Sequence, residues 1–194
     1  MLNSDFSIDF SNGKTEIFNQ KINNWKVNLI DTGLNSMTGG RLKRMKEYIG
    51  DETFMLTYGD GLANINIHEL VKFHKNHGKI ATVTAVRPIA RFGELQIDDE
   101  NLGNVINFQE KPQIKSGWIN GGFFVFNKSI FDYLDDDKTI LEKDPLESLS
   151  KASELRAYKH KGFWQCMDTK RDKDLLNELY LSGEVPWNSK EIIV

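Results

Sequence analysis

The chain has 194 residues, of which 39% are hydrophobic and 27% are charged, as in a globular domain with a sizeable core. Its net charge of -3 at pH 7 argues against the basic surface of a nucleic-acid-binding protein. No apolar run has the roughly 20 residues of a membrane span, no signal peptide opens the chain, and the single cysteine, Cys166, cannot form an internal disulfide. We therefore expect one cytoplasmic domain over residues 1–194, with no nucleic acid or membrane as partner.

The first elements are predicted to be strands. Phe6–Phe10 and Thr15–Phe18 alternate apolar and polar side chains, and the turn pair Asn12-Gly13 lies between them, which predicts a β-hairpin. Trp25–Thr32 also alternates and is predicted to form the next strand.

A loop rich in glycine and hydroxyl side chains follows over residues 32–40 and leads into a helix, because Leu42, Met45 and Ile49 recur at helical spacing. A helix N-terminus offers free N–H groups to a phosphate, and Arg41 can add a planar two-pronged contact. An ordinary capped surface helix with solvated basic side chains fits the same pattern and is the commoner case.

The apolar run over residues 53–58 stops at Gly59-Asp60-Gly61 and predicts a strand buried on both faces, with Asp60 at its carboxyl end. Ligands of open α/β sheets bind outside these ends, so Asp60 is a candidate Mg²⁺ ligand. Asp-Gly is also a common turn pair, and the local string alone favours a turn.

A helix over residues 67–78 and a strand over residues 79–86 come next, which completes a strand–helix–strand unit whose two strands should be parallel. Three histidines lie on or near this helix, namely His68, His74 and His77. We interpret them as a partly exposed helix face, since a metal site would need more ligands nearby.

The remaining elements are shorter. Strands are predicted over 92–98, 105–112 and 118–126, and Asn120-Gly121-Gly122 interrupts the last of them, which fits a bulge, a close approach by a ligand, or a plain defect of a buried strand. Helices over 129–134 and 141–152, a strand over 155–159 and a last helix that Asp168-Thr169 would cap complete the pattern.

Several motifs stand in one order along the chain: Gly39-Gly40-Arg41-Leu42, Tyr58-Gly59-Asp60-Gly61, Phe92-Gly93, Glu110-Lys111-Pro112, Asn120-Gly121-Gly122-Phe123 and Phe163-Trp164-Gln165-Cys166-Met167-Asp168-Thr169. In this order they closely resemble the sugar-phosphate nucleotidyltransferase family, and the match runs through essentially all of the chain. The resemblance implies an α/β fold, the Rossmann-like nucleotide-diphospho-sugar transferase fold, in which helices flank a mixed, mainly parallel sheet.

Ser36-Met37-Thr38-Gly39-Gly40-Arg41 and Gly162-Phe163-Trp164 look most like the branch of the family that converts CTP and glucose 1-phosphate to CDP-glucose and pyrophosphate. The product of that branch feeds deoxysugars of bacterial surface polysaccharide (O-antigen). The resemblance implies that Asp60 and Asp168 hold Mg²⁺ between the nucleotide and the sugar phosphate, where a metal neutralises the charge of the in-line attack. The attacking phosphate oxygen is already anionic, so no general base is expected.

The resemblance also implies two groups of binding residues. The residues expected to face the cytidine nucleotide are Ser36, Thr38, Arg41 and Gly59. The residues expected to line the sugar-phosphate pocket are Gly93, Glu110, Lys111, Asn120 and Gly121. Among these, Lys111 opposes the phosphate charge and joins Asp60 and Asp168 as a catalytic residue.

The family pattern opens with a strand and a glycine-rich loop of the type Gly-Gly-x-Gly-Thr-Arg, which a Lys-Pro element follows. This sequence contains neither that loop nor the Lys-Pro element that belongs to it. The expected fold therefore lacks the first strand–helix–strand–helix part and leaves an edge of the strand over 54–58 unpaired. Three outcomes are open: a complementing N-terminal fragment pairs with this edge, Val27–Ile30 fills the gap, or the chain self-associates. A catalytically silent binding remnant or one subunit of a split enzyme is the alternative function, and a base other than cytosine is a further one.

Overall fold

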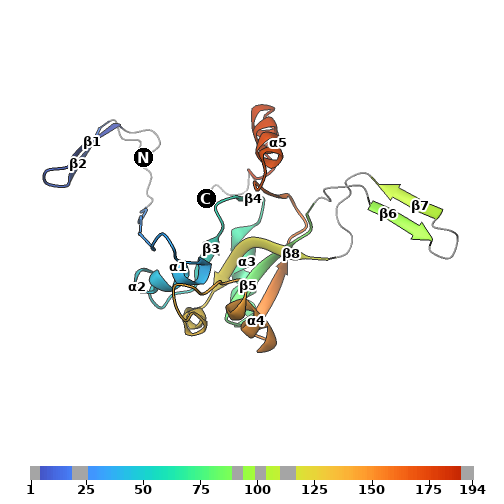
Figure 1. The fold of residues 1–194 in the computed structure, drawn as a ribbon, viewed down its shortest axis with the longest axis horizontal. Helices are drawn as coiled ribbons and strands as arrows, with labels where there is room; N and C mark the ends of the chain where they lie inside the picture. The colour runs from blue at the N-terminus through green and yellow to red at the C-terminus, as the bar shows by residue number, and fades with distance from the viewer. Residues whose placement is uncertain (1–4, 19–25, 89–93, 99–103, 110–116, 189–194) are drawn as a thin grey trace. The chain divides into compact units, whose positions relative to one another are not determined.

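The computed structural model describes residues 5–18, 26–88, 94–98, 104–109 and 117–188 (Figure 1). Its contacts divide the chain into two compact units, residues 1–31 and residues 32–194. Three of the predicted sugar-phosphate residues, Gly93, Glu110 and Lys111, lie outside the described residues.

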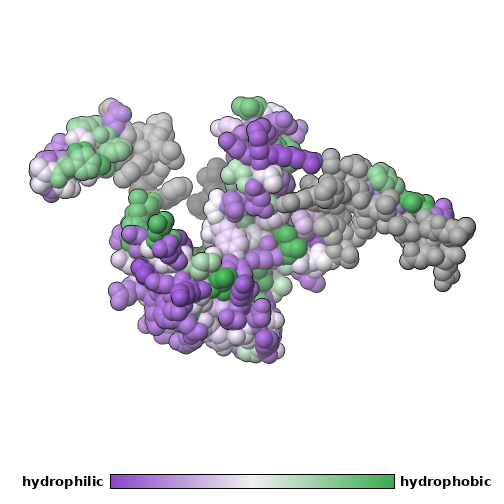
Figure 2. Space-filling view, in the orientation of Figure 1, coloured by the Kyte–Doolittle hydropathy of each residue, from purple (hydrophilic) through white to green (hydrophobic). Residues whose placement is uncertain are grey.

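The first unit contains the predicted hairpin. Strands β1 (Asp5–Asp9) and β2 (Lys14–Phe18) pair antiparallel, and Gly13 takes a φ of 71° in the turn between them. All residues of both strands are exposed, and Figure 2 shows hydrophobic side chains on the surface of this hairpin. The hairpin prediction is confirmed.

The prediction of a strand over Trp25–Thr32 is wrong for the described part of this segment. Residues 26–32 form no regular structure, and Val27 and Leu29 are 72% and 87% exposed. An alternating pattern forms a strand only where a neighbouring strand accepts its backbone hydrogen bonds, and none of the described strands pairs with these residues. Within the described residues, Val27–Ile30 is therefore not a strand of the sheet.

The second unit is built on a four-stranded sheet in the order β3-β8-β5-β9 (Figure 1). The strands are β3 (Phe54–Thr57), β8 (Ile119–Phe126), β5 (Ala81–Val86) and β9 (Leu155–Lys159). Strand β8 is antiparallel to both β3 and β5, and β5 is parallel to β9. Strands β3 and β5 therefore run in the same direction, as the strand–helix–strand pattern predicts, but β8 lies between them.

The core lies on both faces of this sheet because alternate residues of β8 point to opposite faces. Phe124 and Phe126 pack in one cluster with Ile130, Leu141 and Leu149. These residues come from β8, the 3₁₀ helix Lys128–Tyr133, the segment before α4, and helix α4 (Asp144–Lys151). The cluster also includes Leu42 of helix α1 (Thr38–Arg44), which is followed by the short α2 (Lys46–Ile49).

Val125 faces the other side, where it packs with Ile65 and Leu70. Leu70 belongs to helix α3 (Ile67–His77), which begins at the N-cap Asn66 and ends at Gly78, whose φ of 63° is left-handed. Helix α3 contacts β5, β8 and β9, so it covers this face of the sheet.

The histidine prediction is wrong for His74, which is only 1% exposed. Its Nδ1 lies 2.8 Å from Thr82 Oγ1, and its Nε2 lies 3.0 Å from Asn127 Oδ1. His77 Nε2 reaches the same Thr82 hydroxyl at 2.7 Å. These rings join α3 to β5 and to the end of β8, since buried polar groups need partners.

Two further strand pairs and one helix complete the described elements. Strands β6 (Glu94–Asp98) and β7 (Asn104–Gln109) form an antiparallel hairpin, as the sequence predicts. The short strands β4 (Gly61–Ala63) and β10 (Trp164–Cys166) also pair antiparallel. Helix α5 (Lys170–Leu181) starts at Thr169, which forms a capping box with Asp172. None of the helices in the described ranges is long and apolar enough to cross a membrane.

Candidate functional site

The β4–β10 ladder brings Asp60 and Asp168 to the same place. Gly61 is opposite Cys166, and the Asp60 carbonyl accepts a hydrogen bond from the Met167 N–H at 2.8 Å. Asp60 and Asp168 therefore flank the same end of this ladder, and both are exposed. The ladder thus brings the backbone of Asp60 beside the segment that carries Asp168. Carboxylate oxygens are the hard ligands that Mg²⁺ prefers, alongside phosphate and water.

No group of three or more His, Cys, Asp or Glu side chains within the described ranges could hold a metal ion. The Cys166 Sγ lies 3.4 Å from Asp168 Oδ2. Burial, and then the Asp168 carboxylate, raise the pKa of this thiol. Asp60 and Asp168 thus stay the predicted pair for a hard cation.

Helix α1 begins at Thr38, within the predicted loop, and two of its amides are not free. The N–H groups of Gly39 and Gly40 both donate to the Thr139 carbonyl, at 2.9 and 3.2 Å. A Cβ at Gly40 would lie 2.5 Å from the Asp137 carbonyl oxygen. These glycines therefore let the segment 137–139 approach the helix, and the expectation of free N–H groups for a phosphate is wrong for both.

The arginine of this loop also has partners within the protein. Arg41 donates from Nη1 to Thr32 Oγ1 at 2.8 Å and from Nη2 to the Leu34 carbonyl at 3.2 Å. Both bonds hold the turn at residues 32–34, and Arg41 remains exposed. Nearby, Ser36 is only 7% exposed, which leaves little of its side chain available to a ligand.

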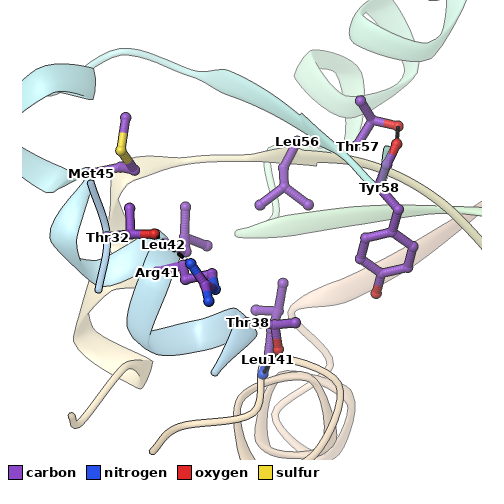
Figure 3. Close-up of a pocket in the computed structure, with 9 residues that line it drawn as sticks. All are labelled: Thr32, Thr38, Arg41, Leu42, Met45, Leu56, Thr57, Tyr58 and Leu141. Atoms are coloured by element: carbon purple, nitrogen blue, oxygen red, sulfur yellow. Dashed lines mark hydrogen bonds between the residues drawn. The ribbon is translucent and has the colours of Figure 1, made fainter. Parts of the chain in front are cut away.

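A pocket of about 250 Å³ lies between α1 and the end of β3 (Figure 3). The side chains that line it are Thr32, Thr38, Arg41, Leu42, Met45, Leu56, Thr57, Tyr58 and Leu141. Figure 3 shows side chains of α1 facing those of Leu56 and Tyr58 across it. The pocket therefore lies beside residues from the predicted nucleotide loop and ahead of Gly59-Asp60.

The glycine pair in β8 makes a bulge, one of the outcomes that the sequence left open. The register with β5 passes from Val83↔Phe124 to Ala85↔Asn120, and Gly122 has a φ of 78°. The Gly121 carbonyl accepts a hydrogen bond from Trp164 Nε1 at 2.8 Å, which joins β8 to β10. The bulge thus places the exposed Asn120 next to the elements that carry Asp60 and Asp168.

Tyr58 connects this bulge to the strand that leads to Asp60. Its N–H donates to the Gly122 carbonyl at 3.1 Å, and its hydroxyl accepts from Asn120 Nδ2 at 3.2 Å. The same hydroxyl donates to Glu142. Burial first, and then Glu142, raise the pKa of Tyr58, so the phenol stays a donor throughout the physiological range.

Sequence reasoning missed Trp164 and Glu142 as contributors to this site. Trp164 belongs to a quoted motif, yet its bond to Gly121 depends on two strands meeting in space. Glu142 lies in an ordinary acidic stretch, and no local signal marks it. The metal-binding and substrate-binding roles of Asp60, Asp168, Ser36, Thr38, Arg41, Gly59, Asn120 and Gly121 stay predictions.

Comparison with protein families gives one match, to the model described as nucleotidyl transferase, over residues 14–175. Among curated relatives, the glucose-1-phosphate cytidylyltransferase of Salmonella typhimurium is 48% identical over 189 residues, which is 97% of this chain and 72% of that protein. The probable glucose-1-phosphate cytidylyltransferase of Bacillus subtilis is 41% identical, over 95% of this chain and 71% of the length of that protein.

Solved structures give the same fold at lower sequence identity. A putative glucose-1-phosphate thymidylyltransferase from Bacillus anthracis, crystallised with sucrose, superposes with a TM-score of 0.57 at 20% identity. The match covers 76% of this chain and 62% of that one, so this chain spans less than two thirds of the solved structure. The mixed sheet flanked by helices is therefore the nucleotide-diphospho-sugar transferase fold that the sequence predicts.

Proposed function

The chain belongs to the nucleotidyl transferase family, and from this premise we propose that it catalyses the reaction of CTP with glucose 1-phosphate to give CDP-glucose and pyrophosphate. The sugar-phosphate oxygen attacks the α-phosphorus of CTP, a new P–O bond forms, and the bond to pyrophosphate breaks with its electron pair. The substrates follow from the relatives that are 48% and 41% identical to the chain. The product would serve deoxysugars of bacterial surface polysaccharide.

The observation that carries this proposal is the convergence of Asp60 and Asp168 on the β4–β10 ladder. We propose that this pair holds Mg²⁺, which when bound would neutralise the charge that gathers on the reacting phosphates. The exposure of both carboxylates supports this role, because substrate phosphates and water must complete the coordination. Of the other predicted catalytic and sugar-phosphate residues, Lys111 would oppose phosphate charge, and Asn120 would meet the sugar beside the bulge.

The nucleotide would lie against the loop at residues 36–41 and over Gly59. Gly59 supports this placement because no atom lies within 4 Å of a Cβ built on it, so a ligand can approach its backbone. Arg41 is already oriented by Thr32 and Leu34, and a guanidinium has further N–H donors to offer a phosphate. The single cysteine is a free thiol, which supports a cytoplasmic location for the reaction.

We also infer a partner for the exposed edge of β3. Among the described strands, β3 pairs only with β8, and Met55 is 40% exposed. The pocket of about 250 Å³ is lined in part by Leu56 and Thr57 of β3. Unpaired apolar edges promote association, so a strand from a second copy of the chain would complete the sheet. Light scattering that finds only a monomer, together with urea unfolding that shows one cooperative transition, would contradict this inference.

Calorimetric titration of CTP with Mg²⁺, combined with a pyrophosphate-release assay containing glucose 1-phosphate, tests the function. Asp60→Asn should abolish the Mg²⁺-dependent part of CTP binding, because an amide is a much weaker ligand than a carboxylate. Asp132→Asn is the matched control, since Asp132 is an exposed carboxylate in the 3₁₀ helix. Absence of both binding and release in the unaltered chain would favour a silent remnant or a subunit that needs its partner.

A further inference from the structure

Glu142 lies between two parts of the candidate site that are distant in sequence. Its Oε2 accepts a hydrogen bond from Thr38 Oγ1 at 2.7 Å, and its Oε1 accepts one from the Tyr58 hydroxyl. Thr38 belongs to the proposed nucleotide loop, and Tyr58 comes two residues before Asp60. One carboxylate therefore binds the nucleotide loop with one oxygen and the strand leading to the metal pair with the other.

Further bonds fix both partners of Glu142. The Thr38 hydroxyl oxygen also accepts the Leu141 N–H at 2.9 Å, while its own proton is donated to Glu142. The Tyr58 hydroxyl oxygen accepts from Asn120 Nδ2 at 3.2 Å while its proton goes to Glu142. The donor directions are thus determined along the whole chain from Leu141 to Asn120.

The backbone around Tyr58 adds rigidity to this chain of bonds. A Cβ on Gly122 would lie 2.7 Å from the Tyr58 ring, so the ring rests directly on the glycine. The Asn120 amide is also fixed, because its Oδ1 accepts the Gly122 N–H at 2.8 Å. Movement of Glu142 would therefore change the position of Asn120, the residue proposed to contact the sugar.

We propose that Glu142 is a positioning residue that holds the nucleotide loop and the Tyr58-Gly59-Asp60 turn at a fixed separation. The proposal rests on the proposed function, and it assigns Glu142 no contact with substrate. Each of its two oxygens accepts one hydroxyl donor, so the two contacts use both oxygens of one side chain. Errors of about 1 Å in the placement of reacting groups commonly cost about 100-fold in rate.

The test compares Glu142→Gln with Glu147→Gln, the same change at an exposed carboxylate of α4. Glutamine keeps the size of the side chain but presents one acceptor oxygen and one NH₂ group, so one of the two hydroxyl bonds is lost. We expect Glu142→Gln to raise the KM for CTP about tenfold or more and to lower kcat. The thermal midpoint should fall only slightly, as expected from the loss of one hydrogen bond. Glu147→Gln should behave as the unaltered chain. Equal CTP parameters in the two variants would overturn the proposal.

A second variant shows whether Glu142 acts through Tyr58. In a Tyr58→Phe background the bond from Tyr58 to Glu142 is already absent, so Glu142→Gln should have a clearly smaller effect on the KM for CTP than in the unaltered chain. Full additivity of the two changes would contradict the connection between them.

Hydrogen exchange separates failure of this inference from failure of the proposed function, because it needs no substrate. Glu142→Gln should speed amide exchange in residues 36–41 and 58–61 together, while α3 keeps its protection. If the unaltered chain neither binds CTP nor releases pyrophosphate, the function fails, and this joint increase would still support the coupling by Glu142. Faster exchange confined to residues around 142 would overturn it.

Discussion

Replacement of Gly40 by alanine is the sharpest test of how the loop at 36–41 is held. The added Cβ would lie 2.5, 2.6 and 2.7 Å from the O, Cα and C atoms of Asp137. These are backbone atoms that cannot rotate away, so the segment 137–139 must move. Overpacking of this kind costs about 1–3 kcal/mol. The same movement weakens the bonds from Gly39 and Gly40 to Thr139, each worth about 1 kcal/mol.

We therefore expect Gly40→Ala to lower the free energy of unfolding by about 2–4 kcal/mol. Urea unfolding followed by tryptophan fluorescence measures this loss. With a denaturant slope of about 2 kcal/mol/M, the midpoint should fall by about 1–2 M while the slope stays the same. An unchanged midpoint would refute the close approach of residues 137–139 to α1.

Gly59→Ala is the matched control, because a Cβ there meets no atom within 4 Å. Its free energy of unfolding should stay within about 0.5 kcal/mol of that of the unaltered chain. The proposed function predicts that this variant loses CTP affinity all the same, since the methyl group would occupy the space of the nucleotide. Calorimetry that finds normal CTP binding by Gly59→Ala would remove Gly59 from the proposed nucleotide site.

Three further predictions concern stability. Burial lowers the pKa of His74 and His77, so the unfolded chain takes up more protons, and the free energy of unfolding should fall as pH drops below about 6.5. Urea unfolding between pH 5 and 8 checks this, and His74→Gln should flatten the dependence. Phe124→Ala should cost about 3–5 kcal/mol in the same assay, because Phe124 is fully buried between Tyr58 and Phe126. Thr169→Ala should cost about 1 kcal/mol through loss of the cap of α5, whereas Ser182→Ala at its other end should cost little.

Local patterns in the sequence predicted the elements whose cause is local. The hairpin turn at Asn12-Gly13, the left-handed end of α3 at Gly78 and the cap at Thr169 each follow from one or two residue types. The order of motifs along the chain also predicted that Asp168 lies near Asp60, but this prediction came only from the resemblance to a family. No spacing rule links two residues that meet because β4 pairs with β10.

The errors arise where a neighbour that is distant in sequence decides the outcome. Trp25–Thr32 alternates as a strand does, yet its described part has no strand beside it. His74 looks like a surface residue on its helix and becomes buried because Thr82 and Asn127 supply both of its hydrogen bonds. In each case a pattern of period 2 or 3.6 reports which residues share a face, and not what covers that face.

The loop at 36–41 shows how one motif serves two purposes. Gly39 and Gly40 fit a phosphate loop and a close helix contact equally well, since both need the absence of a side chain. In the structure their amides bond to Thr139, and the Thr38 hydroxyl bonds to Glu142, so this part of the loop is held by residues 139–142. Under the proposed function, the contribution of this loop to phosphate recognition would then come mainly from Arg41, whose two bonds to residues 32–34 orient the guanidinium without using all of its donors. The glycines would contribute indirectly, because they allow residues 137–142 to fix the helix that carries Arg41.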